Sequence, residues 1–119
     1  MAARDCIFCR VAREEPPGQI IYRDDRVFVI RDIQPQAPVH LLILPLHHMA
    51  SLAYVGPGQE QMMGHIFLVA EEMARREEVT VSGYRLVVNQ GFDAGQTVDH
   101  THVHLLGGEP LLPLGNNRS

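Results

Sequence analysis

Apolar and polar positions recur along the chain with two different periods. Between residues 59 and 78 the apolar side chains follow helical spacing and the charged ones lie opposite, which predicts one long helix after Pro57-Gly58. Shorter β-branched and apolar runs bounded by turn residues predict strands instead. The strand-like runs cover residues 20–23, 27–31, 40–44, 84–89 and 98–106.

The segments between these runs are short and rich in turn residues. Asp24-Asp25 separates the first two runs, which therefore form a predicted hairpin, and residues 91–95 form a glycine-rich loop. A short helical turn is expected over residues 6–13, ended by Pro16-Pro17-Gly18, and an irregular tail follows from Glu109. The pattern predicts an α+β fold with about five antiparallel strands, one long helix and one short one.

Length, composition and charge restrict the number of domains and the kinds of partner that this fold can have. The chain has 119 residues, 45% of them hydrophobic and 20% charged, which fits a single domain over residues 1–119. A formal charge of −4 argues against a nucleic-acid polymer as partner, because such a protein needs a basic surface. No targeting segment is visible, and the apolar run at 41–46 is too short to span a bilayer. We expect a soluble, cytoplasmic protein with no membrane partner.

Three of the seven histidines crowd into five residues, at His100, His102 and His104. On a strand, alternate positions share one face, and successive same-face positions are about 6.6 Å apart. The outer two histidines then lie on the order of 13 Å apart at Cα, which argues against one ion bound by all three. A division of labour is expected, with a central reactive imidazole between its neighbours. Three functionless buried imidazoles would each need a polar partner, so a purely structural role is disfavoured.

The glycine-rich loop leads directly into the histidine run. Gly91 and Gly95 allow close backbone approach, and backbone N–H groups near Thr97 would suit the oxygens of a phosphate. Asn89 and Gln96 flank the same loop. The combination predicts phosphoryl or nucleotidyl transfer, in which a neutral imidazole attacks phosphorus and forms a covalent intermediate that water resolves.

The only two cysteines, Cys6 and Cys9, form one C-x-x-C pair. Such a pair can be half of a zinc site, a redox pair or two small buried residues. The redox interpretation wants a strand before the motif, whereas five residues precede this one. Half of a zinc site needs two further ligands, which the histidines can supply, so the pattern alone leaves the alternatives open.

The histidine run carries a family resemblance. The sequence His100-Thr101-His102-Val103-His104-Leu105-Leu106, preceded by Gly95-Gln96-Thr97-Val98, resembles the signature of the histidine triad (HIT) superfamily. Similarity extends over nearly the whole chain. The run from Asp32 to His40 and the pair Gly107-Gly108 resemble the Hint branch most, and the Cys6-x-x-Cys9 motif resembles its bacterial members.

The resemblance implies a HIT-like fold and an enzyme activity. The family fold is a five-stranded antiparallel sheet, and two chains pair into a homodimer with a ten-stranded sheet. The family hydrolyses nucleoside 5′-phosphoramidates and related purine nucleoside monophosphate conjugates. By position, His102 would be the nucleophile on the α-phosphorus, His104 would hydrogen-bond the phosphate or leaving group, and His40 would help to move protons. Thr97 would contact the phosphate or leaving group.

The resemblance also implies a nucleotide site with three parts. Asp32 would accept the ribose hydroxyls, Asn89 and Gln96 would form the phosphate-side wall, and four apolar residues would line the base pocket. The full set of implied nucleotide contacts is Phe8, Val11, Ile30, Asp32, Ile33, Asn89, Gly95, Gln96, Thr97, His102 and His104.

A structural zinc ion is the implied cofactor. In bacterial relatives with the C-x-x-C motif, both cysteines, the histidine of P-x-x-H and the first triad histidine bind zinc, which here are Cys6, Cys9, His48 and His100. Four protein ligands make a closed structural site. His47 is the rival ligand to His48.

Two other functions compete with the phosphoramidase. The run Gln96-Thr97-Val98 also fits a Fhit-like dinucleoside polyphosphate hydrolase, although Asn89 and Gly107-Gly108 argue against it. A zinc-stabilised nucleotide-binding scaffold with vestigial activity is the second alternative, which the complete triad disfavours. The tail over residues 111–119 lacks the tryptophan that animal Hint proteins use across the dimer, which leaves the leaving group open.

Overall fold

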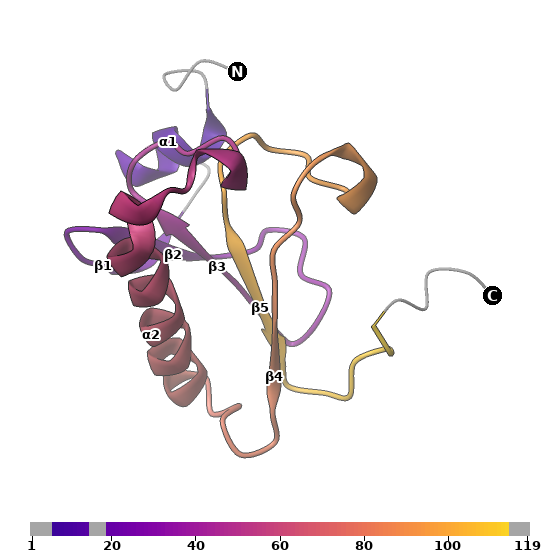
Figure 1. Cartoon of the computed structure of the whole chain (residues 1–119). Coiled ribbons are helices and arrows are strands. Elements are labelled where there is room, and N and C mark those ends of the chain that lie inside the picture. Colours follow the sequence, from indigo (N-terminus) through magenta and orange to yellow (C-terminus); the bar gives the residue numbers. More distant parts are fainter. Residues whose placement is uncertain (1–5, 15–18, 115–119) are drawn as a thin grey trace.

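The fold is a five-stranded sheet with one helix on each face (Figure 1). It is seen in a computed structural model that describes residues 6–14 and 19–114. The helices are α1 (Ile7–Ala12) and α2 (Glu60–Arg76), and the strands are β1 (Ile20–Arg23), β2 (Val27–Arg31), β3 (Val39–Pro45), β4 (Tyr84–Val87) and β5 (Val103–Gly107). Single 3-10 turns lie at Leu52–Tyr54, Pro57–Gln59 and Phe92–Ala94. The predicted break at 16–18 and the last five residues of the tail lie outside the described residues.

The strands pair antiparallel in the order β1-β2-β3-β5-β4. The predicted hairpin of β1 and β2 is confirmed, and its turn closes because Asp24 Oδ1 accepts hydrogen bonds from the N–H groups of Arg26 and Val27, both at 2.8 Å. In the centre, Leu42 of β3 lies opposite His104 of β5. The central pair β3-β5 therefore carries His104, the last histidine of the run.

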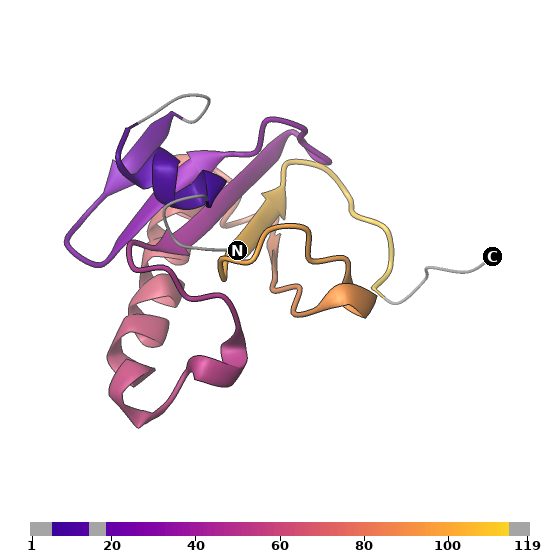
Figure 2. The same ribbon diagram turned by 90° about the horizontal axis from the view of Figure 1, so that it is seen from above.

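The two faces of the sheet bury different cores (Figure 2). On one face, α2 packs its apolar stripe, including Ile66 and Met73, against β2, β3 and β5. On the other face, Val11 of α1 packs against side chains of β2 and β3. Phe67 of α2 does not join this core and is half exposed. Within the described residues no helix is long and apolar enough to cross a membrane.

The strand predicted over 98–106 is wrong in its first half, because β5 begins only at Val103. The N–H of Thr101 donates to the Met49 carbonyl at 2.6 Å and the N–H of His100 donates to the Val98 carbonyl at 2.8 Å. These bonds take the backbone away from a strand ladder. His100 and His102 therefore lie on an irregular segment in front of the strand, and His104 lies within it.

Candidate active site and metal cluster

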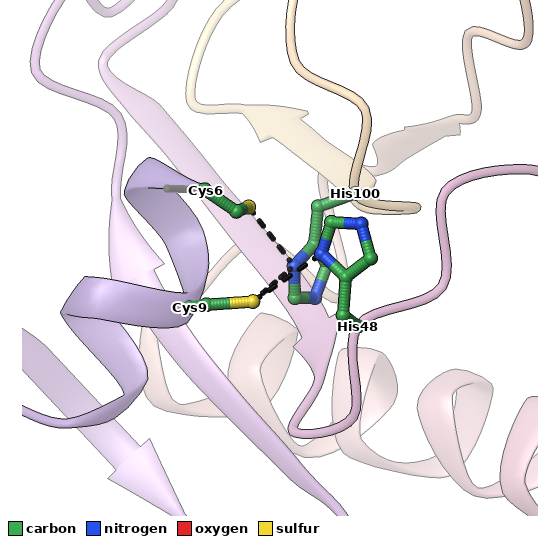
Figure 3. Close-up of side chains that lie close together, drawn as sticks. All are labelled: Cys6, Cys9, His48 and His100. Carbon is green, nitrogen blue, oxygen red and sulfur yellow. Dashed lines mark hydrogen bonds between the residues drawn. The ribbon is translucent and has the colours of Figure 1, made fainter. Parts of the chain in front are cut away.

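Four side chains from three separate segments converge beside α1 (Figure 3). Their ligand atoms all lie within 4.8 Å of one another. Cys6 Sγ lies 3.4 Å from His100 Nδ1, Cys9 Sγ lies 3.5 Å from the same nitrogen, and Cys9 Sγ lies 3.3 Å from His48 Nδ1. The structure thus brings together the four residues that the resemblance implied as metal ligands.

The ring of His100 presents its lone pair to the two sulfurs. Its Nε2 lies 2.9 Å from the Pro45 carbonyl, which can only accept, so Nε2 carries the hydrogen and Nδ1 is free of one. His100 is completely buried, and burial, helped by the neighbouring His48 and His102, lowers its pKa to about 4. This is the neutral form that binds metals, oriented by a backbone carbonyl.

The cluster fits a tetrahedral ion with nitrogen and sulfur ligands. Bonds of about 2.3 Å to sulfur and about 2.0 Å to nitrogen at a tetrahedral angle would put those ligand atoms about 3.6 Å apart, close to the distances between these atoms. Cys6 and Cys9 are buried and form no disulfide. Burial and the neighbouring Cys6 raise the pKa of Cys9 to about 11, so a thiolate here needs a nearby cation. His47, the rival ligand, is exposed and lies outside the cluster.

A cavity of about 500 Å³ opens next to the cluster. It is bounded by α1, β2, the segment after β2, the glycine-rich loop and the histidine run. All eleven implied nucleotide contacts line it: Phe8, Val11, Ile30, Asp32, Ile33, Asn89, Gly95, Gln96, Thr97, His102 and His104. Ile33 is 75% exposed and therefore lies at the mouth.

In the neutral ring of His102, which lines this cavity, the nitrogen without a hydrogen is Nε2. Its Nδ1 lies 2.7 Å from the carbonyl oxygen of His100, so Nδ1 donates and Nε2 keeps a free lone pair. The ring packs edge-on against Phe8 with centroids 5.1 Å apart, and it lies 5.0 Å from the ring of His104. A buried imidazole fixed in this tautomer is suited to nucleophilic attack.

His40 and His104 form a hydrogen-bonded pair behind the nucleophile candidate. The Gln36 N–H donates to His40 Nδ1 at 3.1 Å, so neutral His40 carries its hydrogen on Nε2. That Nε2 lies 2.8 Å from His104 Nδ1 and donates to it, which leaves a hydrogen on His104 Nε2. Burial, together with His102 and His40, lowers the pKa of His104 to about 4, and burial also lowers that of His40. His104 thus offers an N–H donor near an incoming anion.

The family model of the HIT domain matches residues 13–111. The chain belongs to the HIT family. A purine nucleoside phosphoramidase of Escherichia coli (strain K12) is 43% identical over 112 residues, which are 94% of each chain.

Solved structures of HIT proteins share the fold. The HIT family hydrolase from Legionella pneumophila Philadelphia 1 is 39% identical, with a TM-score of 0.87 over 90% of this chain and 96% of that one. A Zn-bound histidine triad family protein from Mycobacterium smegmatis is 27% identical, with a TM-score of 0.78 over 99% of this chain and 82% of that one. The predicted α+β HIT fold is therefore confirmed.

A second group of potential metal ligands in this HIT protein carries a hydrogen where an ion would need a lone pair. Asp32, His40 and His104 have ligand atoms within 4.8 Å of one another, and Asp32 Oδ2 lies 3.4 Å from His40 Nε2. His40 would need a lone pair on Nε2, but the Gln36 N–H holds the lone pair on Nδ1. This group is therefore suited to hydrogen bonding and proton movement.

The glycine-rich loop of this HIT protein uses several of its N–H groups internally. The Gly91 N–H donates to Gln96 Oε1 at 2.8 Å, and the Gln96 N–H donates to the Gly91 carbonyl at 3.1 Å. Gly95 adopts a φ of 83°, in the left-handed region, and closes the Phe92–Ala94 turn. Gln96 thus braces the loop as well as lining the cavity. The N–H groups of Gly91 and Gln96 are used within the loop, and a phosphate contact by backbone N–H groups near Thr97 stays a prediction.

Two backbone groups that select histidine tautomers were not predicted from the sequence. The Gln36 N–H selects the tautomer of His40, and the Pro45 carbonyl selects that of His100. Both act through the backbone, so no side-chain type signals them. Pro45 could be found only as the residue that ends a strand, and Gln36 only as part of the proline-rich segment before His40.

Proposed function

We propose that this HIT protein is a purine nucleoside phosphoramidase that acts through a covalent nucleotidyl-His102 intermediate. The observation that carries the proposal is the free Nε2 lone pair of His102, on a cavity-lining ring whose Nδ1 is held by the His100 carbonyl. The 43% identity to a purine nucleoside phosphoramidase over 94% of the chain supports the substrate class.

The reaction has two displacements. In the first, His102 Nε2 bonds to the α-phosphorus while the P–N bond to the amine breaks, and the departing amine takes up one proton. In the second, water attacks phosphorus, the bond to His102 breaks, and the water gives up one proton, so the cycle balances. The His104 N–H stabilises the phosphoryl oxygens, and the hydrogen-bonded His40–His104 pair is the route along which we place the proton exchange.

The rest of the cavity would bind the nucleotide. We assign the ribose hydroxyls to the carboxylate of Asp32 at the end of β2, and the phosphate side to Asn89, Gln96 and Thr97. The base would lie between apolar side chains of α1 and β2 and the exposed Ile33. Phe8, Val11, Ile30, Ile33 and Gly95 complete the site.

The Cys6, Cys9, His48 and His100 cluster would hold a structural zinc ion. The ligand-atom distances, the lone-pair orientation of His100 and the Zn-bound state of the M. smegmatis relative support this assignment. When bound, the ion cross-links α1, the segment after β3 and the segment before β5.

The assembly we propose is a homodimer joined along β4. In the described part of the chain, β4 is an edge strand, and edge backbone groups offer pairing to a second copy. Phe67 and Leu68 on α2 are 50% and 71% exposed, an apolar surface that a second copy would cover. Sedimentation equilibrium should give twice the chain mass of 13.3 kDa, and Leu68→Lys should shift the mass toward one chain.

A hydrolysis panel tests the activity. Adenosine 5′-phosphoramidate and diadenosine polyphosphate are offered to the protein and to His102→Ala. We expect turnover of the phosphoramidate with a large preference over the polyphosphate, and a loss of about 10⁴-fold or more in His102→Ala with nucleotide binding retained.

Three other results of this panel would contradict the proposal, each in a different way. A preference for the polyphosphate would make the chain a Fhit-like hydrolase. Tight nucleotide binding without hydrolysis would make it a zinc-stabilised scaffold. Wild-type turnover in His102→Ala would refute the covalent mechanism. Cytoplasmic location remains a prediction from the sequence.

A further inference from the structure

We propose that the four metal ligands also position the nucleophile, so that the metal cluster sets the turnover rate as well as the stability of the chain. The proposal rests on the proposed function for its rate prediction. Two structural connections join the cluster to His102, one through the backbone of His100 and one through helix α1.

The first connection is that His100 belongs to both sites. Its imidazole is the buried centre of the cluster, in contact with both sulfurs, and its carbonyl oxygen holds Nδ1 of His102 at 2.7 Å. His102 precedes β5, so the sheet ladder does not fix this carbonyl. The peptide group that bears this carbonyl is also held by the Thr101 N–H, which donates to the Met49 carbonyl at 2.6 Å, and Met49 follows His48. The direction of the carbonyl therefore depends on the segment that carries His48 as well as on how firmly the His100 ring is held.

The second connection is that α1 carries both cysteines and Phe8. Phe8 lies in sequence between Cys6 and Cys9, and its ring packs edge-on against His102 at 5.1 Å and His100 at 6.0 Å. The helix has six residues and no side-chain cap at its N-terminus. Because so short a helix is unstable alone, its position depends on the contacts that hold it to the rest of the protein. The cysteines, together with the packing of Val11 on the sheet, thus hold Phe8 against the nucleophile.

Loss of one ligand would loosen both connections. His48 is the informative ligand, because it contacts Cys9 and the His100 ring but does not line the nucleotide cavity. An effect of His48 on turnover therefore passes through the cluster and the adjoining Met49 backbone, and not through direct contact with the nucleotide. Its neighbour His47 is exposed and lies outside the cluster, and it serves as the matched control.

The test compares His48→Ala with His47→Ala in zinc-containing buffer, well below their unfolding temperatures. Steady-state kinetics separates kcat from KM, and ¹⁵N NMR of the His102 ring reports its tautomer. We expect kcat of His48→Ala to fall about 10-fold or more per folded molecule, and the single Nδ1–H tautomer to become a mixture. His47→Ala should match the wild type in both readouts. A third variant, Ile66→Ala in the α2 core, should lower the unfolding temperature without changing kcat.

The outcomes separate this proposal from the proposed function. Unchanged kcat and an unchanged tautomer in folded His48→Ala would overturn the positioning role, as would an equal fall of kcat in Ile66→Ala. If the wild type hydrolyses no phosphoramidate, the proposed function fails, and the tautomer of His102 in the two histidine variants still decides the positioning role. Should His48→Ala not fold, Cys9→Ser replaces it, because Cys9 is a ligand of the cluster that does not line the cavity, and the same fall in kcat and change of tautomer are expected.

Discussion

The closed cluster around His100 and the open group around His104 use the same side chain for opposite purposes. In the closed cluster, the Pro45 carbonyl takes the hydrogen of His100, and a lone pair points at two sulfurs. In the open group, the Gln36 N–H takes a lone pair of His40, and a hydrogen points at His104. The backbone group behind each ring thus decides whether histidine acts as a ligand or as a donor.

Solvent access differs between the two regions as well. Cys6 and His100 are completely buried, whereas Asp32 and His104 keep partial exposure and line the cavity. A site with four inward ligands leaves no position for substrate. One short histidine run can therefore serve a structural site at one end and a reaction at the other.

Loss of the cysteine ligands of the closed cluster should have the largest effect. Replacing both cysteines, Cys6→Ser with Cys9→Ser, removes the thiolates and should abolish zinc binding. With zinc about 1,000-fold above its dissociation constant, the free energy of unfolding should drop by about 4 kcal/mol. Urea unfolding with and without added zinc measures this, and elemental analysis should give about one zinc per wild-type chain. Equal stability of the variant and the wild type would contradict a structural ion.

The sequence predicted the regular elements better than the site's hydrogen positions. Apolar spacing predicted a helix over 59–78, and the observed helix is Glu60–Arg76. The strand pattern over 98–106 continues through residues whose backbone is diverted by Met49 and by the cluster, so β5 starts only at Val103. Side-chain alternation cannot reveal such a diversion, because it depends on partners distant in sequence.

The residues of the candidate site were predictable from the sequence, but their hydrogen positions were not. The family resemblance supplied the ligand set and the cavity residues, since side-chain types at fixed spacings carry those. The donors and acceptors that select the tautomers of His40, His100 and His102 are backbone groups, which every residue possesses. Only the folded arrangement shows which of them face a ring.

The pH dependence of the unfolding free energy tests the open group around His104, with a smaller expected effect. Burial lowers the pKa of His104 to about 4, against 6.5 for an ordinary histidine. Between these values the unfolded chain binds a proton that the folded chain does not, so this contribution to stability is complete above pH 6.5 and is lost toward pH 4. The unfolding free energy of His104→Asn should therefore fall less than that of the wild type between pH 7 and 5, by about 2 kcal/mol. Parallel pH profiles from urea unfolding would refute a buried neutral His104.

The smallest expected effect concerns the mouth of the cavity. Ile33 is 75% exposed in the free protein and would contact the base only when a nucleotide is bound. Ile33→Ala removes binding that is equal in the ground and transition states, so KM should rise about 5-fold while kcat stays unchanged. Steady-state kinetics with adenosine 5′-phosphoramidate checks this. A fall in kcat at constant KM would place Ile33 in the reaction instead.

The stereochemical course at phosphorus distinguishes attack by His102 from direct attack by water. A substrate made chiral at its α-phosphorus is hydrolysed in ¹⁸O-labelled water, and the configuration of the nucleoside monophosphate is determined. Each in-line displacement inverts phosphorus, so attack by His102 followed by attack by water should give net retention. Net inversion would show a single attack by water and would contradict the covalent role of His102.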